Sequence, residues 1–153
     1  MSRKKKKVQG QGRPRTTQEE HMLKLAMVQW SMSGKTNSRK SIVDGLCSNL
    51  DKLGIKIGYK KPAYLYEALR TATNYLNFDR VVAAIDIKEL MRDLAVDILS
   101  NPNNKNTTTQ AACMIVSGWL GDADGAYSKK SRTFYQTVDQ ILRRKSIKSV
   151  DNK

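Results

Sequence analysis

Residues 38–76 read SRKSIVDGLCSNLDKLGIKIGYKKPAYLYEALRTATNYL, and this stretch decides the expected fold. Its apolar residues recur every three to four positions in two runs, which is the spacing of one helix face. Asn37 or Ser38 is a suitable N-cap for the first run, Gly54 is a suitable end, and Pro62 fits the first position of a second helix. Two short amphipathic helices joined by a glycine-containing connection are typical of a helix-turn-helix. The connection is longer than the usual three or four residues, so a helical bundle with solvated lysines is the alternative.

The helical pattern continues on both sides of this stretch. Upstream, Thr16 and Glu19 have the spacing of a capping box, and the helix that they open is expected to end near Gly34. The second helix of the pair is expected to run to about Leu76. Downstream, a broad apolar stripe over residues 81–99 predicts one longer helix.

Two more helices are expected in the last third of the chain. Thr108 or Thr109 caps one that ends at Gly121, and Ser131 opens another. We therefore predict an all-α fold of five or six helices, with a helix-turn-helix-like N-terminal region and a C-terminal oligomerisation region. The expected divisions are a disordered basic tail (1–15), a nucleic-acid-binding region (16–78), an assembly region (79–145) and a short tail (146–153).

The charge is strongly positive and unevenly distributed. The chain has 28 Lys and Arg residues against 14 Asp and Glu residues, a net charge of +14. Residues 1–78 hold 16 basic and 5 acidic residues, whereas residues 79–100 hold 3 basic and 5 acidic residues. Each Lys or Arg placed on a phosphate releases condensed counterions, so nucleic acid is the favoured partner over an acidic membrane surface or protein. We expect the first three helices to face nucleic acid and the fourth to pack against protein.

Two groups of residues are candidate nucleic-acid contacts. In the tail, residues 12–15 (Gly-Arg-Pro-Arg) match the core of an AT-hook, which would lie in a narrow minor groove. A tail that touches phosphates without sequence preference is the simpler interpretation. In the folded part, basic residues gather at the start of the second helix of the pair. The candidates are Lys4, Lys5, Lys6, Lys7, Arg13 and Arg15 in the tail, and Lys60, Lys61, Tyr64 and Arg70 in the folded part. We expect contacts mainly to the phosphates of double-stranded DNA, with RNA as the alternative.

The sequence offers little for catalysis. Residues 33–36 (Ser-Gly-Lys-Thr) end like a phosphate-binding loop, but Gln29 stands where the pattern needs glycine, and a helix is expected where it needs a strand. His21 is the one histidine and has no partner nearby in the sequence. No Cys/His spacing suits zinc. We predict no catalytic residue, no metal site and no cofactor, and hence a protein that is not an enzyme.

Glu89, Asp93 and Asp97 share one face of the long helix predicted over residues 81–99. They could hold a metal ion, but a solvated or interface face is the usual explanation of such spacing. The apolar stripe of this helix is broad, and six short helices are not expected to cover all of it. We therefore expect self-association through the C-terminal half, with these carboxylates meeting a neighbouring subunit through Arg143, Arg144 and Lys145.

The cysteines and the apolar stretches indicate in which cellular compartment the protein is expected. Cys47 and Cys113 lie in apolar surroundings and are expected to be small core residues in a reducing compartment. No stretch approaches the roughly 20 apolar residues of a membrane span, and the N-terminus lacks the apolar segment of a secretory signal. We expect a cytoplasmic protein, in a host cell if the protein is viral, and no membrane partner.

Taken in order, the elements resemble a bacteriophage terminase small subunit, the DNA-recognition component of a genome-packaging motor. The resemblance covers residues 36–121 and implies ring assembly by the later helices and contact of the C-terminal end with the large ATPase subunit or portal. A long turn and Leu53–Ile57, where an alanine-rich step is common, depart from the pattern. A nucleocapsid-like structural protein and a phage or plasmid transcriptional regulator are the alternatives. The segments that carry the resemblance are residues 58–62 (GYKKP), 87–90 (IKEL), 95–99 (AVDIL), 101–102 (NP), 111–112 (AA) and 119–121 (WLG).

Overall fold

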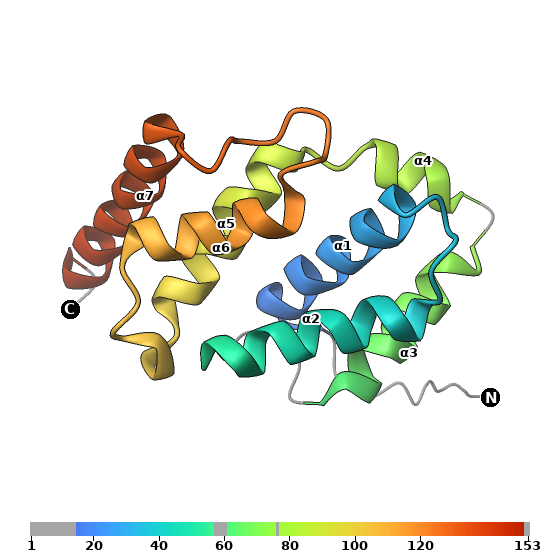
Figure 1. Cartoon of the computed structure of the whole chain (residues 1–153). Coiled ribbons are helices and arrows are strands. Elements are labelled where there is room, and N and C mark those ends of the chain that lie inside the picture. The colour runs from blue at the N-terminus through green and yellow to red at the C-terminus, as the bar shows by residue number, and fades with distance from the viewer. Residues whose placement is uncertain (1–14, 57–60, 76, 152–153) are drawn as a thin grey trace, which may run out of the picture.

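The computed structural model describes residues 15–56, 61–75 and 77–151. Within them the chain is all-α, with seven α-helices, one short 3-10 helix and no strand, so the expected fold class is confirmed and the expected five or six helices are too few (Figure 1). The elements are α1 (Thr17–Met32), α2 (Arg39–Leu53), α3 (Pro62–Thr73), α4 (Phe78–Ala83), α5 (Ile87–Ser100), η2 (Pro102–Asn104), α6 (Thr109–Leu120) and α7 (Arg132–Asp151).

The helix boundaries follow the capping residues. The Thr16 hydroxyl accepts a hydrogen bond from the Glu19 amide at 3.1 Å, and the Glu19 carboxylate accepts one from the Thr16 amide at 2.8 Å, which completes the capping box of α1. The Ser38 hydroxyl accepts a hydrogen bond from the Ser41 amide at 3.0 Å and so caps α2, and Gly54 ends that helix in the left-handed conformation that glycine adopts without strain. Pro62 occupies the first turn of α3 as predicted, but α3 ends at Thr73 rather than near Leu76.

The single long helix expected over residues 81–99 is wrong, because the chain breaks between Ala83 and Ile87. The Asp86 side chain accepts a hydrogen bond from the Glu89 amide at 3.1 Å and so caps a new helix, α5. An aspartate at this position satisfies an amide that has no partner inside the helix. The apolar stripe is therefore divided between a short helix, α4, and α5.

Helices α1 and α5 are the centres of two groups that pack on each other. We call α1, α2 and α3, which contact one another, the N-terminal group, and α5, α6 and α7, which do likewise, the C-terminal group. Helix α1 also contacts α4, α5 and α6, so it joins the groups (Figure 1). In the view of Figure 1, α7 lies at one end of the molecule and α4 at the other.

The apolar stripe of α5 is buried in the core of the molecule. Met91, Leu94, Ala95 and Ile98 are fully buried, and Leu90 is nearly so. The α5 part of the stripe thus closes the protein's own core, whereas Val81 on α4 stays 42% exposed, so the stripe is not covered completely. No described helix combines the length and apolar character that a membrane span needs.

Candidate nucleic-acid interface

Helix α3 has one buried face and one exposed face. Leu65 and Leu69 lie one turn apart and are 1% and 0% exposed, because they pack into the core between α1 and α2. Tyr64, Glu67 and Arg70 point away from the core and are exposed. We call Lys61 and these three residues the α3 face. Three of the predicted contacts, Lys61, Tyr64 and Arg70, thus lie on one surface.

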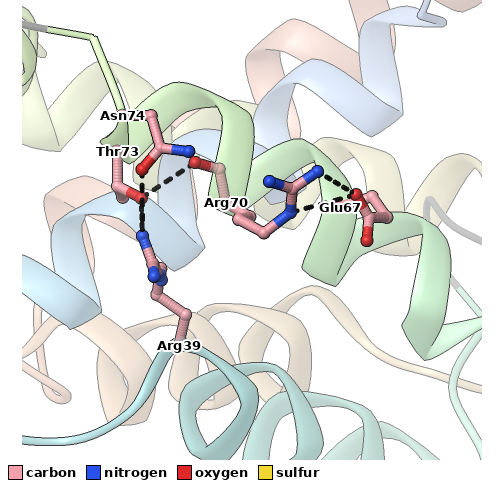
Figure 2. A network of polar contacts seen from close by, with 5 residues as sticks. All are labelled: Arg39, Glu67, Arg70, Thr73 and Asn74. Atoms are coloured by element: carbon pink, nitrogen blue, oxygen red, sulfur yellow. Dashed lines mark hydrogen bonds and ion pairs between the residues drawn. The ribbon is translucent and has the colours of Figure 1, made fainter.

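Arg70 is already occupied within the α3 face. Its Nε and Nη2 atoms donate to Glu67 Oε2 at 3.2 and 2.8 Å (Figure 2). The hydrogen bond with Glu67 raises the pKa of Arg70 above its ordinary value. Since both side chains are exposed, water weakens the pair, and Arg70 can exchange the carboxylate for a phosphate at small cost. Glu67 thus places a negative charge on the same surface as the candidate contact Arg70.

A second arginine holds α3 against α2. Arg39 Nη1 donates to Thr73 Oγ1 at 2.6 Å and lies 3.5 Å from Asn74 Oδ1, and Thr73 Oγ1 in turn donates to the Arg70 carbonyl at 3.1 Å (Figure 2). A cation at the C-terminal end of a helix interacts favourably with the helix dipole. The guanidinium also lies 5.7 Å from the centre of the Trp30 ring. Arg39 therefore connects α1, α2 and the end of α3, a role that its sequence position did not indicate.

Aromatic and basic side chains meet at the start of α3. Lys61 stands at the N-cap without a capping hydrogen bond from its side chain, and its Nζ atom lies 6.0 Å from the centre of the Tyr64 ring. Tyr64 is 53% exposed, and Tyr75, just past the other end of the helix, is 63% exposed. Tyr75 was not singled out by the sequence analysis. Its position after the apolar run of α3 could have indicated that this tyrosine is exposed.

Of the other predicted contact residues, only Arg15 is among the described residues. Arg15, before α1, forms an ion pair with Glu20. Lys4 to Lys7, Arg13 and Lys60 lie outside the described residues.

The segment that ends like a phosphate-binding loop has a structural role. It follows helix α1, as predicted, and Gln29 lies within that helix and donates to the Trp119 carbonyl at 3.1 Å. Lys35 Nζ pairs with Asp79 Oδ1 at 2.7 Å and lies 5.7 and 5.4 Å from the centres of the Trp30 and Phe78 rings. Lys35 thereby connects the end of α1 to the start of α4.

The three carboxylates that share a face of α5 have different surroundings: Glu89 is exposed and the Asp93 side chain is 41% exposed, whereas Asp97 is buried. Asp97 is 7% exposed and its Oδ2 atom lies 2.6 Å from His21 Nδ1, while Asp93 Oδ2 lies 3.5 Å from His21 Nε2. The expected contact of Asp97 with a neighbouring subunit is therefore wrong, because α1 covers it. In the part of the chain that the structure describes, no three His, Cys, Asp or Glu side chains are arranged to hold a metal ion.

The cysteines fit the core assignment to different degrees. Cys113 is fully buried in α6, and burial raises the pKa of its thiol to about 12. Cys47 is half-buried on α2, and burial also raises its pKa. Since the thiolate is the reactive form, neither side chain has the environment of a nucleophilic cysteine.

Comparison with protein-family models, with curated proteins and with solved structures finds no match for this chain. The chemistry and geometry of the described residues are therefore the basis on which a function is proposed.

Proposed function

We propose that this protein is a non-catalytic, double-stranded-DNA-binding subunit of the kind that recognises viral DNA for genome packaging. The observation that carries the proposal is the α3 face, where Lys61, Tyr64 and Arg70 are exposed on a helix whose other side is anchored in the core. A chain with a net charge of +14 favours a polyanionic partner for such a face.

The α3 face suits contacts to phosphates. The amides at a helix N-terminus attract anions, and Lys61 adds a full positive charge at that end. Tyr64 can donate from its hydroxyl, and Arg70 can move from Glu67 to a phosphate oxygen. Arg39 keeps α3 in place, so the three side chains approach the duplex from a preorganised helix.

The resemblance to terminase small subunits also favours self-association of this protein and a large ATPase subunit as a second partner. Linked copies that each bind DNA weakly gain affinity through effective concentration. Light scattering at moderate salt should give the mass of a discrete oligomer at tens of micromolar. A strict monomer would remove the assembly part of the proposal and favour a monomeric DNA-binding protein.

A nucleocapsid-like protein and a transcriptional regulator are the competing functions. Uniform coating of any sequence in a footprint favours the nucleocapsid, whereas protection of one site favours a packaging subunit or a regulator. A neighbouring gene for a packaging ATPase would favour the packaging subunit over the transcriptional regulator.

The α3 face is tested by measuring DNA affinity against salt. Replacing Lys61 and Arg70 together by alanine should weaken binding and lower the slope of log affinity against log salt by about 0.9 for each phosphate that the variant no longer neutralises. The matched control replaces Lys129 and Lys130, two exposed lysines between α6 and α7, and removes the same charge. Equal slopes for the two double variants would show that total charge, and not the α3 face, is responsible.

The tail is tested by deleting residues 1–15. Because its basic residues can contact phosphates of any sequence, the deletion should weaken binding to all duplexes alike and reduce the same slope. An unchanged slope would mean that the tail does not contact phosphates.

A further inference from the structure

The one histidine of the chain lies where the two helical groups meet. His21 is on α1, its side chain is 14% exposed, and it faces α5. Its two ring nitrogens have different partners: Nδ1 lies 2.6 Å from Asp97 Oδ2, and Nε2 lies 3.5 Å from Asp93 Oδ2. Asp97 itself is nearly buried, whereas the Asp93 side chain is 41% exposed.

The protonation state of the ring decides whether both contacts are favourable. An imidazolium carries a hydrogen on each nitrogen and can donate to both carboxylates, whereas a neutral ring carries one hydrogen. The nitrogen without a hydrogen then presents its lone pair to an anionic oxygen. Since Asp97 has little access to water, loss of the positive partner leaves a poorly solvated carboxylate, which is costly.

We propose that His21, Asp97 and Asp93 form a pH-sensitive clasp between the N-terminal and C-terminal groups, closed when His21 is protonated and loosened when it loses its proton. The clasp is a property of the fold and holds whether or not the protein binds nucleic acid.

The charged groups around the ring act in both directions. The hydrogen bond to Asp97 is the largest influence and raises the pKa of His21, burial lowers it, and Asp97 and Asp93 raise it further through their charge. Lys24, on the next turn of α1, lowers it, and the net shift is upward from 6.5. The groups that act on the ring, Asp97, Asp93 and Lys24, lie on α5 and on α1 itself.

The sign of the pH dependence follows from this shift. A histidine whose pKa is higher in the folded state binds its proton more tightly there, so its contribution to stability is complete below pH 6.5. That contribution is lost as pH rises through the folded-state pKa. Burial also raises the pKa of Asp93, with Glu89 and Asp97 adding to the effect and His21 opposing it. Asp93 therefore favours the folded state at low pH as well.

Because the chain has a single histidine, proton NMR follows the clasp directly in the full-length protein. We expect a titration midpoint above 6.5, a lower midpoint in the Asp97→Asn variant, and a smaller decrease in Asp93→Asn. A wild-type midpoint at or below 6.5, or one that does not respond to Asp97→Asn, would overturn the proposal.

The role between the groups is tested by a double-mutant cycle of His21→Gln and Asp97→Asn, with urea unfolding at pH 6 and pH 9. The interaction between the two sites should be measurable at pH 6 and much smaller at pH 9. The exposed Lys40–Asp44 pair contains no histidine and is the control, with the same small interaction at both pH values. Equal interaction of His21 with Asp97 at the two pH values would contradict the proposal.

Hydrogen exchange supplies a readout that does not depend on the variants folding. Amide protection in α1 and α5, corrected for the intrinsic effect of pH, should decrease between pH 6 and pH 9 in the wild-type protein more than protection in α6. A uniform change across the three helices would show that no clasp connects α1 and α5.

Discussion

Helices α3 and α5 each carry charged side chains at helical spacing, but they use these charges in opposite ways. Glu67 and Arg70 pair with each other on the open surface of α3. On α5, Asp93 and Asp97 face His21 of another helix, and Asp97 is 7% exposed. Spacing thus places charges on one face, while the neighbouring helix decides whether that face meets water or protein.

The difference also determines how much each charged side chain contributes to the stability of the fold. An exposed ion pair contributes at most about 1 kcal/mol, since water screens it and both side chains lose freedom. A poorly solvated carboxylate depends on its partner, because nothing replaces a missing hydrogen bond. Changes on α5 should therefore alter folding, and changes on α3 should alter binding.

The largest effect is expected for Leu94→Asp on α5. Leu94 is fully buried, and the change removes core packing and adds a charge without a partner. Loss of the leucine side chain alone costs about 2–5 kcal/mol, and the buried charge adds to this. We expect an unfolded protein by circular dichroism. Tyr64→Asp on the exposed side of α3 is the control and should change stability by less than about 1 kcal/mol.

The next effect is expected for Asp97→Ala at pH 6, measured by urea unfolding. The variant loses the hydrogen bond between Asp97 and His21, which should cost about 1.5–3 kcal/mol because both partners are poorly solvated. Glu67→Ala removes the corresponding acid from α3 and should cost clearly less stability, because water screens the exposed pair with Arg70. Similar losses of stability in the two variants would contradict the distinction between a buried charge on α5 and an exposed charge on α3.

A smaller effect is expected for Arg39→Lys. Lysine keeps the charge but cannot reproduce the planar contact with Trp30 together with the hydrogen bond to Thr73. We expect a loss of about 0.5–1.5 kcal/mol in stability and weaker DNA binding, although Arg39 is not itself a proposed phosphate contact. Unchanged DNA affinity would show that α3 needs no support from α2.

The smallest effect is expected for Glu67→Gln. The change removes a negative charge from the α3 face and releases Arg70, so DNA affinity should rise, by less than about fivefold given the weakness of an exposed ion pair. The measurement is fluorescence anisotropy at fixed salt, with Asp124→Asn in the exposed turn after α6 as the control of equal charge change. A rise of the same size in both variants would assign the gain to net charge alone.

Helix boundaries could be predicted from the sequence where a side chain caps the backbone of residues a few positions away. Thr16 caps α1 and Gly54 ends α2 as predicted, and of the paired candidates Asn37 or Ser38 and Thr108 or Thr109 the caps are Ser38 and Thr108. Asp86 has the same signal, an aspartate three residues before Glu89, yet the continuous apolar stripe concealed the break between α4 and α5.

By itself, the sequence determined the all-α class, most of the helix starts and the placement of three candidate contacts along one helix, from Lys61 at its N-cap through Tyr64 to Arg70 in its last turn, because capping and periodicity act within a few residues. Only the tertiary structure decided that Asp97 meets His21 and that Arg39 reaches Thr73. These partners are 76 and 34 residues apart in the chain, and no periodicity extends across such a separation. Helix packing brings them together, since burying the apolar faces of α1, α3 and α5 fixes which polar side chains are carried into contact.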